Sequence, residues 1–523
     1  MGDAKSEMLP AKHDTNFPHG SRKSKGESLH RKKSLSIMNT PSPNLFQAAL
    51  AHHQAGRLSE AESLYQKILQ AAPDHQAALH LSGVIALKTG KSEVAAERIG
   101  KAIRVAPSAH LYCDMGLALQ AQGKLEEAIT RYRRAISLKP DFADAHNNLG
   151  AALQAQGKLG EAAECYNKVI SINPRYFEAY NNLGLVFQAQ GNPYVAAECY
   201  HKALLIKPDF SEALINLGHT FRDLDELRQA AVIYQKSLDT DPDNSGVIAA
   251  TYLAILHYLD GNIEHSRSKL LEAQFNTILA DPMYQNARKY SLYLDKLLSW
   301  HGQFNNIPDS TRHMETLHVI GESHSLTAHG VVVGYMGKKL RCAANWIEGC
   351  KQWHLGNGKA NKYKHKFEAV MERLPGNSVV LLTIGEIDCR HDEGIIQVCK
   401  KNPEKTLAEV MHSTVNAYLK YVAEIGARHG HRIIICGVPA PNISLEKLQA
   451  SAAEQLVHLI RIFNASLKDM SRVIDLDFLD IYALTNRGDG IASGIWHIDD
   501  HHLIPDAMME AFDRKLEIAA SNS

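Results

Sequence analysis

A proline recurs every 33 or 34 residues through the first half of this chain, at Pro73, Pro107, Pro140, Pro174, Pro208 and Pro242. Glycines keep the same spacing, and each is expected to turn the chain between two helices: Gly56, Gly90, Gly123, Gly157 and Gly191. A fixed period of this length indicates one small structural unit per repeat, each burying its apolar face against its neighbours. The first half is therefore expected to be a linear stack of helical pairs with no single central core.

Three more series share this period. A second set of glycines is expected where two helices approach closely, and it is accompanied by an alanine and a tyrosine series: Gly116, Gly150, Gly184, Gly218; Ala128, Ala162, Ala196, Ala230; Tyr132, Tyr166, Tyr200, Tyr234. A period of 34 with this pattern is typical of tetratricopeptide repeats. Residues 42–280 are thus expected to form an α superhelix with a concave face. Six repeats begin near Asn44, Gln76, His110, Ala143, Phe177 and Ser211, and a degenerate helical pair follows from Gly246 to Ala280.

One register of the repeats carries amide or carboxylate side chains 34 residues apart, at Asp114, Asn148, Asn182 and Asn216. The three asparagines resemble the asparagine ladder in the superhelix of O-linked N-acetylglucosamine transferases. That resemblance implies a groove that holds the backbone of an extended peptide, since an amide both donates and accepts hydrogen bonds. The alternative is that asparagine persists in the repeat consensus for hydrogen bonds within a single repeat.

Composition excludes some classes of protein and favours others. Lys and Arg total 57, as do Asp and Glu, so no overall charge points to nucleic acid or membrane. Eight scattered cysteines without a C-x-x-C pair favour a reducing compartment, and we expect a cytoplasmic location. No apolar run approaches the length that spans a bilayer. Residues 1–41 are expected to be a disordered basic tail and 281–314 a connecting helix and linker.

The C-terminal segment, residues 315–520, alternates short apolar runs with amphipathic helical patterns. Strands are expected at Leu317–Ile320, Leu340–Ala344, Val379–Ile384, Ile433–Cys436 and Val473–Leu476, and helices at Lys362–Leu374, Thr406–Arg428 and Glu446–Met470. This alternation predicts an α/β domain of three layers, with a parallel sheet between two layers of helices.

Three short motifs in this segment resemble the sequence blocks of the SGNH hydrolase family, also called GDSL-like. The family's Gly-Asp-Ser block corresponds to Gly321-Glu322-Ser323, and its Gly-x-Asn-Asp block to Gly385-Glu386-Ile387-Asp388. Its Asp-x-x-His block corresponds to Asp499-Asp500-His501-His502. Its second-block glycine is best matched by Gly349, with Gly356 and Gly358 as the alternatives. The resemblance covers nearly all of the α/β segment.

The resemblance implies a serine hydrolase. Ser323 would be the nucleophile and His502 the base that takes its proton, while Asp499 would orient the imidazole. The N–H groups of Ser323 and Gly349 would bind the oxyanion. Ile387 stands where the family has an oxyanion-binding asparagine, so we expect either a substitute donor, with Arg390 as the candidate, or slow or absent catalysis. No cofactor is implied.

Alternatives to these roles stay open. Ser323 is also an ordinary helix N-cap residue, for a helix starting near Leu326. A second alternative is a transition-metal site, for which imidazole and carboxylate are suitable ligands, although no recognised spacing is present. Its candidate ligands are His497, Asp499, Asp500, His501 and His502, joined by Glu386, Asp388 and His391. Two functions follow. One is an ester hydrolase or O-acyl transferase, acting on an acyl ester such as an acetylated sugar and recruited to a protein partner by the repeats. The other is an interaction scaffold with a catalytically inactive terminal domain.

Overall fold

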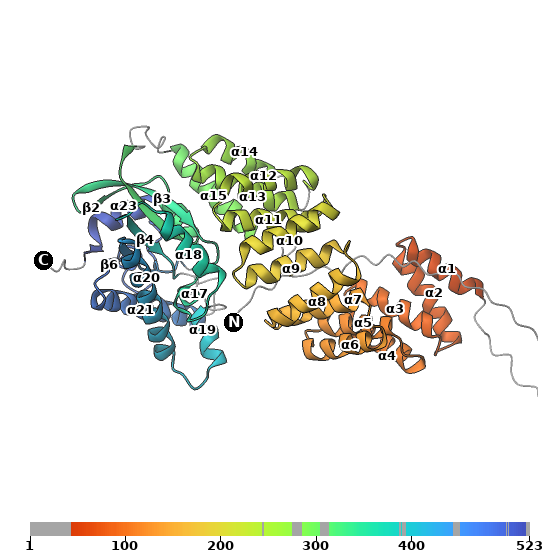
Figure 1. Ribbon diagram of the computed structural model, residues 1–523. Coiled ribbons are helices and arrows are strands. Elements are labelled where there is room, and N and C mark those ends of the chain that lie inside the picture. The colour runs from red at the N-terminus through yellow and green to blue at the C-terminus, as the bar shows by residue number, and fades with distance from the viewer. Residues whose placement is uncertain are drawn as a thin grey trace, which may run out of the picture. The chain divides into compact units, whose positions relative to one another are not determined.

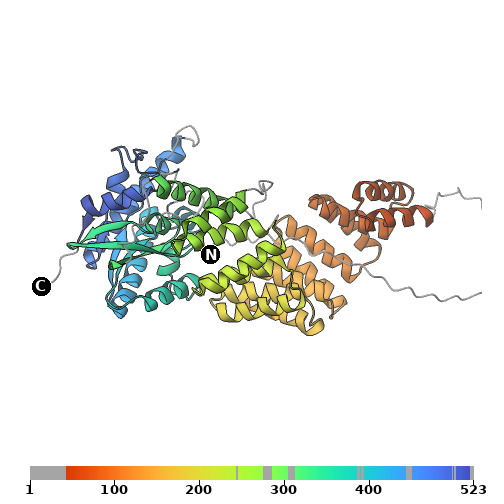
Figure 2. The ribbon, with the colours of Figure 1, turned by 90° about the horizontal axis from the view of Figure 1, so that it is seen from above.

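The computed structural model describes residues 43–242, 245–274, 285–303, 313–385, 389, 394–442, 450–497, 499 and 502–518. The predicted basic tail therefore lies outside the described residues. The chain divides into two units, residues 1–186 and 187–523, and the boundary falls inside helix α9. Figure 1 labels most of the elements named below, and Figure 2 gives a second view of them.

The first unit consists of helical pairs that follow the predicted period. They are α1 (Pro43–Gln54), α2 (Leu58–Ala71), α3 (Gln76–Lys88), α4 (Ser92–Val105), α5 (Ala109–Ala121), α6 (Leu125–Leu138), α7 (Ala143–Ala155), α8 (Leu159–Ile172) and the first part of α9 (Phe177–Ala189). The turn glycines adopt positive φ, for example 73° at Gly56 and 75° at Gly123, a conformation that costs glycine little. The prediction of helical repeats is confirmed.

Two successive repeats of this unit bury a tyrosine against the glycine of the preceding helix, whereas Gly83 meets Ile99 instead. Tyr132 and Tyr166 are fully buried, and their rings lie where a Cβ on Gly116 or Gly150 would be. Their hydroxyl groups donate to Gln120 (2.9 Å) and to the equivalent glutamine one repeat later, so no buried donor is left unpaired. The repeated glycine and tyrosine are thus one packing device.

Gly116→Ala is expected to destabilise the first unit by about 1–3 kcal/mol, because the added methyl would lie 2.4 Å from a Tyr132 ring carbon in a closely packed interior. Gly160, in helix α8, is the matched control, since its Cβ would meet nothing within 4 Å. Gly160→Ala should leave the free energy of unfolding unchanged or raise it by up to about 1 kcal/mol. Urea unfolding followed by circular dichroism measures both, and equal effects would contradict this packing account.

The second unit begins with the remaining helices. They are α10 (Pro193–Ile206), α11 (Ser211–Asp223), α12 (Leu227–Thr240), α13 (Ser245–Leu259), α14 (Ile263–Gln274) and α15 (Gln285–Gln303). Asp225 takes the place of the turn glycine with φ 61°, as a short polar side chain can. Helices α13 and α14 correspond to the predicted degenerate pair, and α15 packs on both of them. No helix within the described residues is long and apolar enough to cross a bilayer.

The rest of this unit is an α/β domain built on one sheet. Its strands are β1 (Thr316–Gly321), β2 (Val332–Tyr335), β3 (Lys338–Trp346), β4 (Val379–Thr383), β5 (Arg432–Cys436), β6 (Asp477–Leu479) and β7 (Leu516–Glu517), in the order β2-β3-β1-β4-β5-β6-β7. The five central strands are parallel, whereas β2 and β7 pair antiparallel at the two edges. The expectation of a parallel sheet therefore holds for its centre only.

The strand expected at Val473–Leu476 is wrong. Helix α21 (Ala450–Val473) runs into this apolar stretch, Asp475 then adopts a φ of 60°, and the strand starts at Asp477. Asp477, the first residue of this strand, is buried and accepts a hydrogen bond from Arg432 (2.7 Å). A search for apolar runs could not locate a strand that begins with a charged residue.

Both faces of the sheet are covered by helices, which confirms the two helical layers. One face packs on α17 (Gln352–Gly356), α18 (Lys362–Arg373), α19 (Gly394–Lys401), α20 (Leu407–His429) and α21. The other face packs on α16 (Ser323–Ala328), α22 (Ile481–Thr485) and α23 (Pro505–Arg514). Alternate residues of the central strands enter the two cores, as Val380 and Leu381 do on β4.

Candidate active site

Strand β1 delivers Ser323 to the C-terminal edge of the sheet. The strand ends at Gly321, where a side chain would collide with Thr383 at the end of β4 (Cβ–Oγ1 2.1 Å). Helix α16 starts at the next turn with Glu322 as its N-cap and Ser323 as its first residue. Ser323 is therefore not the cap of this helix, and that alternative is wrong. Its position is the one at which open α/β sheets place reacting groups.

The two other predicted catalytic residues lie beside it. His502 Nε2 is 3.0 Å from Ser323 Oγ, and both Asp499 carboxylate oxygens lie 3.0 Å from His502 Nδ1. A carboxylate can only accept, so His502 carries its proton on Nδ1 and presents the lone pair of Nε2 to the serine hydroxyl. The backbone N–H of His502 also donates to Asp499 (2.8 Å), so the two residues are held together by both backbone and side chain. The structure thus brings Ser323 together with the Asp499–His502 pair, although Ser323 and His502 are 179 residues apart in the sequence.

Glu322 adds a second acceptor for the same serine. Its Oε2 accepts the backbone N–H of Ser323 (2.6 Å) and faces the hydroxyl at 2.5 Å, while its Oε1 accepts the hydroxyl of Tyr290 (2.6 Å). Ser323 has one hydroxyl proton, so Glu322 and His502 compete for it. The Ser323 N–H, expected to bind an oxyanion, is occupied by Glu322 in this conformation.

Helix α15 contributes two tyrosines that sequence reasoning missed. The Tyr293 ring stacks on the imidazole of His502, with centroids 3.9 Å apart and an interplanar angle of 22°. Its hydroxyl donates to the Ser323 carbonyl (3.2 Å) and contacts Thr327, and Tyr290 binds Glu322 as described. The segment 281–314 was expected to be only a connecting helix and linker. The sequence signal for these two tyrosines was a row of aromatic residues at helical spacing. Ordinary core packing gives the same pattern, so it did not indicate a site.

The predicted oxyanion residues are partly described. Gly349 has a φ of 70° and is the third residue of a turn in which Cys350 N–H donates to Ile347 O (3.3 Å). Ile347 N–H in turn donates to Gly321 O (2.7 Å), so this turn is fixed to the end of β1. Arg390, the candidate substitute donor, lies outside the described residues, as does Ile387.

The alternative metal site cannot be assembled from described residues. His497, Asp499 and His502 are described, whereas Asp500 and His501 are not, and the carboxylates of the Gly385 motif are not described either. Asp499 is engaged with His502 and also faces Lys296 at 3.8 Å.

The asparagine register lies on the first helix of each pair, as expected: Asp114 on α5, Asn148 on α7, Asn182 on α9 and Asn216 on α11. Several of these side chains bond to the preceding repeat. Asp114 pairs with His80 (2.5 Å), Asn148 donates to Cys113 Sγ (3.4 Å) and the buried Asn182 donates to Asn147 (3.1 Å). These bonds run between neighbouring repeats and not within one repeat as the alternative expected, and they engage part of the register inside the array.

The buried His329 and the half-buried His301 make stability depend on pH. Burial lowers the pKa of His329 to about 3 and that of His301 to about 4. Their unfolded-state pKa is about 6.5, so between these values the unfolded chain binds more protons and stability falls as the pH falls. From pH 6.5 to pH 5 the loss is expected to be about 2 kcal/mol for His329.

Chemical denaturation at pH 7 and pH 5 measures that loss. His329→Gln should flatten the pH dependence, whereas the same change at the exposed His412 should leave it as in the wild type. A His329→Gln variant with the full pH dependence would contradict the assignment.

Comparison with known families identifies the helical array. Tetratricopeptide repeat models match residues 42–75, 177–210 and 211–244, and a model described as a TPR repeat matches 116–157 and 153–191. The array is built from tetratricopeptide repeats. This agrees with the 34-residue period and with the helical pairs of the structure.

Three solved structures are similar to parts of this chain. MamA is 29% identical over 31% of this chain and 94% of its own, with a TM-score of 0.29. YrrB, described as a TPR protein with an unusual peptide-binding site, is 23% identical over 34% of this chain and 91% of its own, with a TM-score of 0.29. PilF of Pseudomonas aeruginosa is 20% identical over 41% of this chain and 96% of its own, with a TM-score of 0.35. No curated protein matches. TM-scores this low support no structural equivalence, so the identification of the tetratricopeptide repeats rests on the family models and the helix pattern.

Proposed function

We propose that the α/β domain is a serine ester hydrolase of the SGNH type, recruited to a protein partner by the tetratricopeptide repeats. The observation that carries this proposal is the Ser323–His502–Asp499 arrangement, in which each side chain lies 3.0 Å from the next. A free hydroxyl is a weak nucleophile at neutral pH, and this geometry supplies the base and the orienting carboxylate that activate it.

The proposed reaction has two steps. Ser323 Oγ attacks the ester carbonyl carbon and its proton passes to His502 Nε2; the C–O bond to the alcohol then breaks, and His502 protonates the leaving oxygen. Water next attacks the acyl-enzyme, giving a proton to His502, and the carboxylic acid leaves as Ser323 Oγ regains a proton. A second alcohol in place of water would make the same site an O-acyl transferase. An acetylated sugar remains our candidate substrate, on the breadth of the SGNH family.

Two features favour the second candidate, a binding scaffold. Ile387 replaces a side-chain oxyanion donor, and loss of one such donor typically costs about 10²–10³ in rate. Glu322 also occupies the Ser323 N–H, so its carboxylate must move before that amide can bind an oxyanion. On this alternative the repeats bind a protein or an extended peptide, and the α/β domain binds a ligand without turnover.

Hydrolysis of p-nitrophenyl acetate by the intact chain separates the two candidates. The hydrolase proposal expects saturable turnover that a serine-directed sulfonyl fluoride abolishes. A rate that rises linearly with protein and survives the inhibitor would instead reflect surface nucleophiles and would favour the scaffold.

A further inference from the structure

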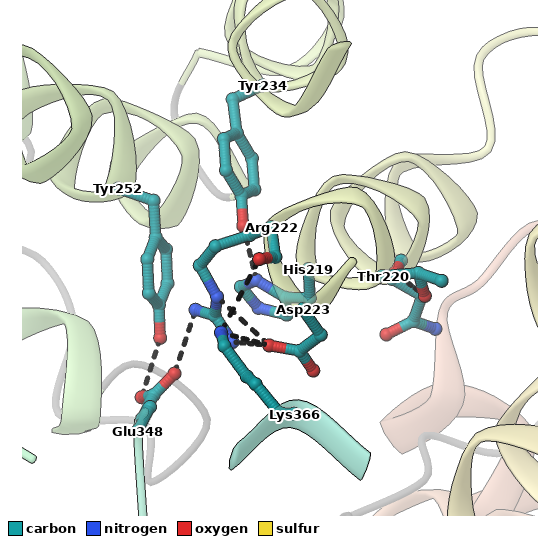
Figure 3. Close-up of polar contacts among 9 residues, drawn as sticks. His219, Thr220, Arg222, Asp223, Tyr234, Tyr252, Glu348 and Lys366 are labelled. Carbon is teal, nitrogen blue, oxygen red and sulfur yellow. Dashed lines mark hydrogen bonds and ion pairs between the residues drawn. The ribbon is translucent and has the colours of Figure 1, made fainter. Parts of the chain in front are cut away.

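Helix α11 of the sixth repeat ends in a buried arginine that reaches the α/β domain. Arg222 is 6% exposed, and its Nη1 donates to Glu348 Oε2 (2.9 Å) while its Nη2 donates to Asp223 (3.0 Å) (Figure 3). The guanidinium also lies 5.0 Å from the ring centroids of Tyr252 and Trp346. These contacts fix the direction of the guanidinium, because each uses a different edge or face of the group.

Glu348 is held a second time from the helical side. The Tyr252 hydroxyl, on α13, donates to Glu348 Oε1 at 2.8 Å, so both carboxylate oxygens are bound by residues of α11 and α13 (Figure 3). Lys366 on α18 donates to Asp223 (3.0 Å). The two cations, Arg222 and Lys366, thus balance the two carboxylates, Asp223 and Glu348. Burial alone would raise the pKa of Asp223, but Lys366 and Arg222 outweigh it and keep this carboxyl ionised.

Glu348, which Arg222 and Tyr252 bind, is the residue that precedes Gly349. Glu348 keeps a negative φ and Gly349 has a φ of 70°, which makes them the two central residues of a type II turn. Such a turn fixes the peptide plane between its central residues, and that plane contains the Gly349 N–H. The Gly349 N–H has no hydrogen-bond acceptor in the described part of the chain, so it is available to a ligand.

We propose that Arg222 and Tyr252 are positioning residues for ester hydrolysis: by holding Glu348 they aim the Gly349 N–H at the oxyanion formed when Ser323 attacks. This inference rests on the proposed hydrolase function. It makes the last repeats part of the catalytic apparatus. It also offers a route by which a partner bound to α11 could change the rate.

A second ion pair between the same two parts provides a matched control. Asp225, just after α11, pairs with Arg373 at the end of α18, and both side chains are about 40% exposed, at 42% and 39%. This pair joins the helical part to the α/β domain without touching Glu348 or the Gly349 turn. Removing this ion pair measures how a weaker contact between the helical part and the α/β domain affects catalysis when Glu348 is left in place.

The experiment measures kcat and KM of the full chain with p-nitrophenyl acetate. Arg222→Ala is expected to lower kcat by about 10–100-fold with KM changed by less than about threefold, since only the transition state carries the oxyanion. Tyr252→Phe, which removes one hydroxyl and should fold even if Arg222→Ala does not, should lower kcat by about three- to tenfold. Arg222→Lys should recover part of the loss, and Arg373→Ala should stay within about twofold of the wild type.

The outcomes are distinguishable. Wild-type kcat in Tyr252→Phe, or equal losses in Arg373→Ala and Arg222→Ala, would overturn the positioning role and leave the hydrolase proposal standing. Absence of turnover in the wild type would overturn both. Binding of a phenylboronic acid, whose tetrahedral adduct mimics the oxyanion, should weaken in parallel with kcat across these variants.

Discussion

Ser323→Ala is expected to lower kcat for p-nitrophenyl acetate by about three to four orders of magnitude, or to the uncatalysed rate if the wild type is slow. The hydroxyl is the only atom of this residue that faces His502 Nε2, and no other described side chain lies between them. KM should change little, because the hydroxyl is needed for bond formation and contributes little to substrate binding.

Ser325 gives the matched control for this variant. It lies two residues further along α16, and its hydroxyl donates to the Glu322 carbonyl (2.7 Å) without facing His502. Ser325→Ala should keep kcat within about threefold of the wild type. If Ser323→Ala and the wild type hydrolyse the ester equally fast, the domain is not a serine hydrolase and the scaffold function is the better account.

Asp499→Asn is expected to have the next largest effect, a loss of about 10²–10⁴ in kcat. The carboxylate accepts the Nδ1 proton of His502 at 3.0 Å from both oxygens, which leaves Nε2 free to accept from Ser323. An asparagine amide can donate to Nδ1 instead, and the imidazole proton then moves to Nε2, where it blocks transfer from the serine. The fold should be unaffected, since the substitution preserves the shape of the side chain.

A Lys296 variant separates the orienting role of Asp499 from the effect of a neighbouring charge. Its ammonium lies 3.8 Å from Asp499 and is 44% exposed, so Lys296→Met removes a neighbouring charge while leaving the His502–Asp499 contact intact. That variant should retain kcat within about threefold. An Asp499→Asn enzyme with more than a tenth of wild-type activity would show that Asp499 does not orient the base.

The sequence predicted what depends on short, local patterns. The repeats followed from the spacing of Pro73 to Pro242, because a fixed period implies one recurring structural unit. The Gly116–Tyr132 contact, which recurs one repeat later, is part of that unit. The proximity of Ser323, Asp499 and His502 was implied by the resemblance of their two motifs to the SGNH hydrolase blocks, and only the Ser323 motif follows a predicted strand. The edge strands β2 and β7 were missed, since at four and two residues they carry too little pattern.

Other features could not be read from the sequence because they depend on packing between distant segments. Tyr290 and Tyr293 look like core aromatics on a linker helix until α15 is placed against α16. Arg222 and Glu348 are 126 residues apart, and nothing local marks either as half of a buried ion pair. The double contact of Glu322 with Ser323 depends on the bend between β1 and α16, which a motif comparison does not describe.

The most direct test of the relay is the site of covalent labelling by a fluorophosphonate. Mass spectrometry of the digested full chain should find one adduct, on the peptide that contains Ser323, and the adduct should disappear in His502→Ala because the serine is then no longer activated. A folded wild-type chain that stays unlabelled, or that is labelled at another residue, would contradict the account.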